Sequence, residues 1–111
     1  MEYRLAKQNE ADAIYDLVQT TIKEIYPKYY LKEIVDMFCN FHNRDNISKD
    51  INNGNTYVLL ENGIIIGTGT IRENHITRVY VHPAVQGRGC GTYIMNMLEL
   101  LIMEFGNVRK V

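Results

Sequence analysis

Apolar positions near the start of the chain change from strand-like to helical spacing. Residues 3–6 predict a short first strand. After it, apolar residues recur every three or four positions and mark one face of a helix. They are Ala11, Ile14, Leu17, Val18, Ile22 and Ile25. We expect Asn9 to cap this helix and Pro27 to end it.

A second apolar stripe with helical spacing predicts a second helix. Its members are Leu31, Ile34, Val35, Phe38 and Cys39. Residues 46–51 predict a short third helical turn, which Asn53-Gly54 ends.

The middle of the chain has the pattern of strands. Residues 56–60 are nearly all apolar, and residues 64–71 form a return segment. Asn62-Gly63 between them strongly indicates a two-residue hairpin turn, because both turn positions need a positive φ. Residues 76–81 predict a further strand, and Pro83 closes it because proline cannot donate to a ladder.

A last helix, expected to start at Thr92, follows a glycine-rich segment. Its apolar stripe comprises Ile94, Met97, Leu98, Leu101 and Phe105. Gly106 stands where a C-cap glycine is expected, and residues 108–111 have the pattern of another strand. The order of elements predicts one α/β domain over residues 1–111, with a mixed sheet of the α+β kind.

Composition and charge argue against several classes of protein. A chain of 111 residues with 46% hydrophobic and 23% charged residues is typical of one soluble domain. The net charge of -1 gives no overall attraction to nucleic acid or to a membrane. The polar N-terminus lacks the apolar core of a signal peptide, so we expect a cytoplasmic protein. Cys39 and Cys90 lack metal-ligand spacing, so we expect no metal; they can form one disulfide, but reduced thiols are favoured.

The most informative segment joins the strand at 76–81 to the last helix through Gln86-Gly87-Arg88-Gly89-Cys90-Gly91. A helix N-terminus presents unpaired N–H groups and the positive end of the helix dipole, so phosphates bind there. Glycines let the backbone approach such an anion closely. Arg88 adds a cation and Thr92 a hydroxyl.

The glycines alone leave two interpretations open, a phosphate-binding loop and a tight turn without a ligand. Two other nucleotide loops are excluded. A P-loop needs Gly-Lys-Ser/Thr, which does not occur here. A dinucleotide fingerprint needs G-x-G-x-x-G, whereas this loop reads G-x-G-x-G.

The combination of strand, loop and helix resembles the GNAT superfamily of N-acetyltransferases over nearly all of the chain. That family's signature, Gln/Arg-x-x-Gly-x-Gly/Ala, matches at Gln86, Gly89 and Gly91. Residues 78–83, Arg-Val-Tyr-Val-His-Pro, are similar to the family's aliphatic-aromatic-Val-x-Pro strand end. The resemblance implies the GNAT-like acyl-CoA N-acyltransferase fold and acetyl-CoA as co-substrate.

In this family the loop amides hold the pyrophosphate of acetyl-CoA, and the strand holds the pantetheine arm like an added strand. The resemblance thus assigns cofactor binding to Val79, Tyr80, Val81, Gln86, Gly87, Arg88, Gly89, Cys90, Gly91 and Thr92. It also implies direct acetyl transfer to a primary amine of a small molecule or peptide. A general base would remove the amine proton, and a strand N–H would polarise the thioester carbonyl.

For the general base, the resemblance points to polar residues at the start of the strand, Glu73, His75 and Thr77. Imidazole is the side chain best suited to proton transfer near neutral pH, although a single histidine is commonly a surface or packing residue. Tyr29 and Tyr30 lie where the family builds its acceptor site, and ordinary packing explains them as well. We interpret the remaining candidates as packing or solvent-facing: His42, His82, Met95, Met97 and Met103.

The chain departs from the family pattern at its C-terminus. Family members continue with a fifth strand that forms half of the cofactor cleft, a helix that often supplies a tyrosine to the thiolate, and two more strands. Val111 stands about where the fifth strand begins. We therefore expect an incomplete GNAT domain that binds CoA weakly and forms a homo-oligomer through an exposed strand edge. A catalytically inactive CoA-binding module and a protein-interaction module are the alternatives.

Overall fold

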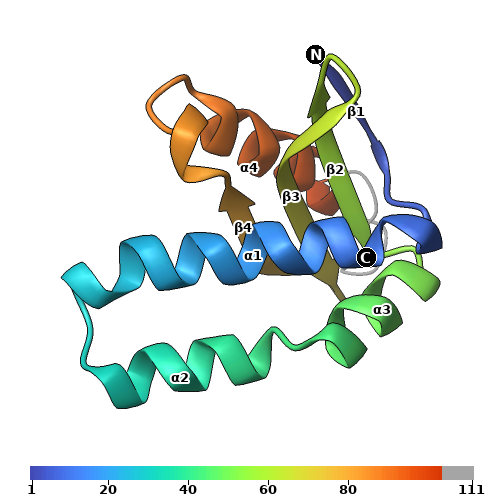
Figure 1. Ribbon diagram of the computed structural model, residues 1–111. Helices are drawn as coiled ribbons and strands as arrows, with labels where there is room; N and C mark the ends of the chain where they lie inside the picture. The colour runs from blue at the N-terminus through green and yellow to red at the C-terminus, as the bar shows by residue number, and fades with distance from the viewer. Residues whose placement is uncertain (104–111) are drawn as a thin grey trace.

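A four-stranded antiparallel sheet carries helices on both of its faces (Figure 1). The computed structural model describes residues 1–103, and within them the strand order is β1-β2-β3-β4. The strands are β1 (Glu2–Leu5), β2 (Thr56–Glu61), β3 (Ile64–Arg72) and β4 (His75–Val81). The helices are α1 (Ala11–Ile25), α2 (Lys32–Phe41), α3 (Arg44–Asn52) and α4 (Cys90–Leu101). The α/β fold predicted from the sequence is confirmed, and the described strands are all antiparallel.

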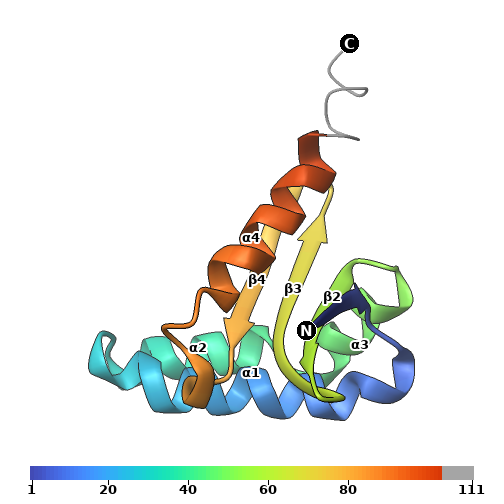
Figure 2. The same ribbon diagram turned by 90° about the horizontal axis from the view of Figure 1, so that it is seen from above.

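Two hydrophobic clusters separate the faces of the sheet, with α1, α2 and α3 on one face and α4 on the other (Figure 2). The buried members of the first cluster are Ala11, Ile14, Leu17, Val18, Ile22, Val35, Ile47, Ile51, Val58, Leu60 and Tyr80. Those of the second are Leu59, Ile66, Val81, Cys90, Ile94 and Leu98. The predicted α1 stripe is thus almost entirely core, whereas in the predicted α2 stripe only Val35 is fully buried.

Two glycines of β3 let α4 lie close against the sheet. A Cβ at Gly69 would stand 2.6 Å from Ile94 Cγ2 and 2.9 Å from Leu98 Cδ1, and a Cβ at Gly67 would stand 2.8 Å from Ile94 Cδ1. Ile94 and Leu98 are both fully buried. Protein interiors are close-packed, so neither side chain has room to move aside. The two glycines therefore fix the position of α4 and of the loop at its start.

The predicted helix cap at Asn9 is wrong. Asn9 lies in a 3-10 turn, Gln8–Glu10, and makes no cap to α1. The carboxylate of Glu10 organises this turn instead: it accepts the Lys7 N–H at 2.8 Å and the Arg4 guanidinium at 2.9 and 2.8 Å. The hydrogen bonds from Arg4 lower the pKa of Glu10 to about 2. An ion pair to β1 thus replaces the expected amide cap.

Both hairpins of the sheet turn through residues with a positive φ. The predicted hairpin between β2 and β3 is confirmed, with φ of 53° at Asn62 and 78° at Gly63. The turn between β3 and β4 was not predicted. Glu73 and Asn74 adopt φ values of 48° and 71° there without a glycine, a conformation that non-glycine residues seldom take. Because of this turn, β4 pairs directly with β3 and begins at His75.

The last helix begins at Cys90, two residues before the predicted start at Thr92. Three expectations fall outside the described residues: Phe105 in the apolar stripe, the cap at Gly106 and a strand at 108–111.

Within residues 1–103, no helix has the length and apolar character needed to cross a membrane. Cys39 and Cys90 are both free thiols. In the same part of the chain, no group of three or more histidine, cysteine and acidic side chains is placed to hold a metal ion.

Candidate functional site

The loop between β4 and α4 borders a hollow of about 450 Å³ (orange in Figure 1). The lining residues are Val79, Val81, Gln86, Gly87, Gly89, Cys90, Gly91 and Thr92. Every one of them was assigned to cofactor binding from the sequence. Two further residues of that assignment, Tyr80 and Arg88, do not line the hollow. Tyr80 is instead buried in the cluster under α1, α2 and α3.

The loop presents a row of N–H groups that have no acceptor within residues 1–103. Gly87 and Gly89 have φ values of 86° and 81°, a left-handed conformation that favours glycine. A Cβ at either position would meet nothing within 4 Å, so their backbone conformation, not lack of space, requires glycine. The first described bond of α4 runs from Tyr93 N–H to Gly89 O at 3.0 Å. The described residues offer no acceptor to the N–H groups from Gly87 to Thr92, which makes the start of α4 an anion-binding arrangement.

The cation expected in the loop is engaged by a carboxylate. Both terminal nitrogens of Arg88 donate to Glu61, at the end of β2, and these hydrogen bonds lower the pKa of Glu61. The pair ties the loop to the hairpin between β2 and β3. Glu61 therefore compensates the Arg88 charge, and the backbone N–H groups are the donors that the loop offers to an anion.

Along β4, the backbone N–H and C=O groups of successive residues face β3 and the open edge of the sheet in turn. His82 N–H donates to Ile66 O on β3 at 2.9 Å, so by the two-residue period the Tyr80 backbone also faces β3. The backbone groups of Val79 and Val81 then face outward. Consistent with this, Val81 O accepts the Gln86 side-chain amide at 3.0 Å. In the part of the sheet that the structure describes, Val79 N–H and C=O and Val81 N–H lie on the open edge, beside the loop.

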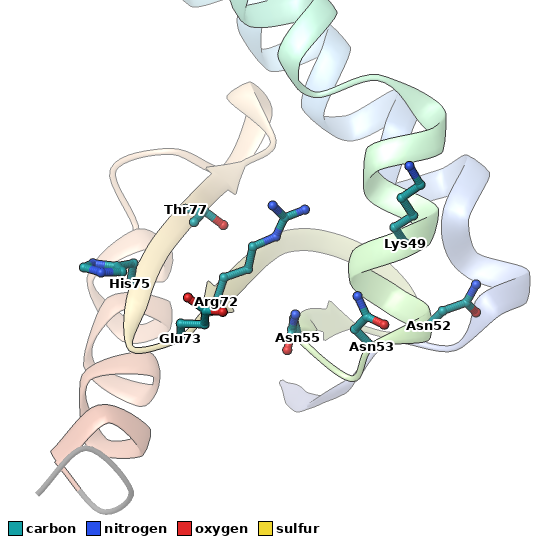
Figure 3. Close-up of a pocket in the computed structure, with 8 residues that line it drawn as sticks. All are labelled: Lys49, Asn52, Asn53, Asn55, Arg72, Glu73, His75 and Thr77. Atoms are coloured by element: carbon teal, nitrogen blue, oxygen red, sulfur yellow. The ribbon is translucent and has the colours of Figure 1, made fainter. Parts of the chain in front are cut away.

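The three candidates for general base line a second, larger hollow of about 1020 Å³ (Figure 3). It lies between the turn joining β3 to β4 and the end of α3, and the structure brings Glu73, His75 and Thr77 together in it. All three side chains are exposed. The other lining residues are Lys49, Asn52, Asn53, Asn55 and Arg72.

A bulge in β4 sets Thr77 apart from its neighbours. The pairing passes from Ile71–Ile76 to Thr70–Arg78, which leaves Thr77 without a partner on β3. Such bulges re-aim backbone and side-chain groups and are frequent beside active sites. Thr77 also lines a small cavity with Arg78, on the face of α1, α2 and α3. The loop hollow lies on the opposite face, where Val79, Val81 and Cys90 belong to the cluster under α4. The two hollows therefore reach the open edge of β4 from opposite faces of the sheet.

A buried ionic network supports the larger hollow, and the sequence did not predict it. Asp50 is 1% exposed and pairs with Arg78 at 3.1 Å and with Arg72 at 2.7 Å. Arg78 also donates to His42 Nδ1 at 2.9 Å and to Thr70 Oγ1 at 3.1 Å. Burial, together with the Arg78 charge, lowers the pKa of His42 to about 4. His42 is therefore a neutral acceptor, which agrees with its interpretation as a structural residue.

The remaining candidates lie away from both hollows. Tyr29 and Tyr30 are exposed in the connection from α1 to α2, and the Tyr30 ring contacts Tyr26 and Phe38. His82 accepts the Ala84 N–H at 3.1 Å and caps the 3-10 turn Pro83–Val85.

Known families and structures that resemble the chain share this arrangement of sheet and helices. The acetyltransferase (GNAT) domain family matches residues 7–105. The PaiA N-acetyltransferase of Thermoplasma acidophilum, solved in complex with coenzyme A, is 16% identical with a TM-score of 0.77, over 95% of this chain and 73% of that chain. A GCN5-related N-acetyltransferase of Rhodopseudomonas palustris is 20% identical with a TM-score of 0.86, over 95% of this chain and 67% of that chain. Rv2747 of Mycobacterium tuberculosis, solved with CoA, is 20% identical with a TM-score of 0.65, over 94% of this chain and 58% of that chain.

The structural similarities establish the fold. No curated protein sequence matches the chain, and the family assignment rests on the domain match over residues 7–105. That match includes all four helices, strands β2 to β4 and the glycine loop. The chain belongs to the family of GNAT acetyltransferase domains.

Proposed function

We propose that this chain forms the acetyl-CoA-binding part of an N-acetyltransferase that transfers acetyl directly to a primary amine. The observation that carries the proposal is the row of N–H groups from Gly87 to Thr92, at the start of α4, which have no acceptor among the described residues. Such a row binds phosphate oxygens. The PaiA and Rv2747 structures, each solved with coenzyme A, support CoA as the carrier of those phosphates.

The open edge of β4 continues the loop site. The outward backbone groups of Val79 and Val81 can pair with the amides of an extended pantetheine arm, as they would with an added strand. In this arrangement the loop binds the pyrophosphate and the edge orients the arm. The thioester then lies toward the bulge at Thr77.

The larger hollow is the side from which the amine approaches. The amine lone pair attacks the thioester carbonyl carbon, the C–N bond forms, and the C–S bond breaks to release the thiolate. His75 is our candidate for the base that accepts the amine proton, directly or through water. A backbone N–H at the bulge is our candidate for polarising the carbonyl oxygen.

Replacing Gly89 by valine is expected to weaken acetyl-CoA binding at least about tenfold, measured by calorimetric titration. A β-branched residue does not adopt a φ of 81°, so the row of N–H groups would lose its shape. Gly54→Val is the matched control, because Gly54 has a φ of 72° and equally open surroundings but does not line the loop hollow. Both variants should lose similar stability, and only Gly89→Val should lose affinity.

The same titration separates the alternatives. Unchanged affinity in Gly89→Val would contradict the proposal. No binding by the unmodified chain, with Gly89→Val affecting stability alone, would favour a protein-interaction module. Binding without acetyl transfer to any amine would favour an inactive CoA-binding module.

A further inference from the structure

Two cationic side chains line the larger hollow from opposite sides (Figure 3). Arg72 extends from the end of β3, and Lys49 extends from α3. Both side chains are exposed to solvent, so both are accessible to a ligand.

The ionic network of Asp50, Arg72 and Arg78 leaves an excess of positive charge beside this hollow. Asp50 Oδ1 accepts a hydrogen bond from Arg72 Nε at 2.7 Å and forms an ion pair with Arg72 Nη2 at 2.7 Å, and Asp50 Oδ2 forms an ion pair with Arg78 Nη1 at 3.1 Å. One carboxylate is thus shared by two guanidinium groups. Within residues 1–103, Arg72 Nη1 has no acceptor and Lys49 forms no ion pair. Each of these groups can therefore donate to an incoming anion.

The Arg72 guanidinium and the Asn55 backbone are held in place before any ligand binds. Asp50 fixes the Arg72 guanidinium through two nitrogens. Asn55 is held by its backbone, since its N–H donates to Asp50 O at 2.9 Å and its carbonyl accepts the Ile71 N–H at 3.0 Å. The Asn52 and Asn53 side chains add amide donors beside Lys49. The Arg72 guanidinium is thus a fixed donor, and a fixed donor lowers the ordering cost of binding.

The opposite end of the hollow has a different chemistry. Glu73 is the carboxylate among the described lining residues, and it lies with His75 at the turn between β3 and β4 (Figure 3). The hollow is therefore polarised: Lys49 and the amides lie toward α3, the Arg72 guanidinium is held by Asp50 of α3, and a carboxylate and an imidazole lie at the turn. A ligand with an anionic group and an amino group matches this polarity.

We propose that this hollow selects a primary amine that carries a carboxylate as the acetyl acceptor. Lys49 and Arg72 bind the carboxylate, and the amino group extends toward Thr77 and His75. This inference rests on the proposed acetyltransferase function. A polyamine lacks the anionic group. Its positive charges are repelled by Lys49 and Arg72.

The test compares 3-aminopropanoate with propylamine, two primary amines of similar length that differ by the carboxylate. We expect 3-aminopropanoate to bind at least about tenfold tighter at low ionic strength, by NMR titration, because charge-assisted hydrogen bonds add to its affinity. Lys49→Gln should remove most of this preference. Lys49 is exposed and outside the Asp50 network, so the variant should fold. Lys23→Gln, an exposed lysine of α1 that lines neither hollow, should retain it.

Equal binding of the two probes, an unchanged preference in Lys49→Gln, or tighter binding of spermidine would overturn the inference. Acetyl-CoA is titrated in parallel. Acetyl-CoA binding without a carboxylate preference contradicts the inference and leaves the proposed function standing. A carboxylate preference without acetyl-CoA binding contradicts the proposed function and leaves the anion-binding wall standing.

Discussion

Asp50→Asn is expected to destabilise the protein by about 3–5 kcal/mol, because it leaves two guanidinium groups without their carboxylate. The Arg78 side chain is only 2% exposed, so water cannot take the place of Asp50. Domains of this size are stable by about 5–15 kcal/mol, so this loss removes a large part of the stability and should lower the urea midpoint. Urea unfolding followed by circular dichroism measures the effect. Asparagine has nearly the same shape as aspartate, so the loss reports the charge.

Asp36→Asn is the matched control for this substitution. Asp36 pairs with Lys32 at 3.0 Å on the exposed side of α2, and its side chain is 63% exposed. Exposed ion pairs of this kind contribute about 0.5 kcal/mol or less. Equal stability losses in the two variants would show that the buried network does not stabilise the fold.

Gly69→Val is expected to cost about 3 kcal/mol of stability, at the upper end of what overpacking a core costs. The added side chain would begin 2.6 Å from Ile94 and 2.9 Å from Leu98, both fully buried. Gly69→Ala should cost less, and thermal unfolding of the series measures the gradation. Gly91→Ala is the control, because a Cβ there lies 3.7 Å from Val81 and alanine favours the helix.

A double variant identifies the cause of this loss. If Ile94 is the side chain that clashes, Gly69→Ala with Ile94→Ala should be more stable than the sum of the two single losses indicates. Strict additivity of the two losses would instead indicate that α4 moves as a unit away from β3.

Local signals in the sequence predicted most of the elements. The α1 stripe and the Asn62-Gly63 turn each depend on residues close together in the chain, and both are confirmed. The loop residues from Gln86 to Thr92 follow directly after a strand and precede a helix. Their placement around one hollow follows from this local order.

Features that depend on distant residues were missed. Asp50 and Arg78 come from different elements, and no periodicity links them. The one available signal was Arg78 itself, a charge within an otherwise apolar strand end. Arg88 was expected to face an anion, but Glu61, far away in the chain, binds it. The turn at Glu73-Asn74 was missed because it lacks glycine.

The described structure leaves β4 at an edge of the sheet, so the homo-oligomer expected through this edge stays a prediction. The amine-binding role of the larger hollow and the role of His75 as base depend on the same edge. The amine-binding role and the role of His75 both depend first on whether the loop binds CoA.

The most direct test of that claim is a ¹H–¹⁵N NMR titration of the chain with CoA, because it detects weak binding residue by residue. We expect the largest shifts at the N–H groups from Gly87 to Thr92 and at Val79 and Val81. Pantetheine, which lacks the phosphates, should shift the β4 signals and leave the loop signals in place. Shifts confined to the hollow around Lys49 and Arg72, or loop shifts of equal size with pantetheine, would contradict phosphate binding by the loop.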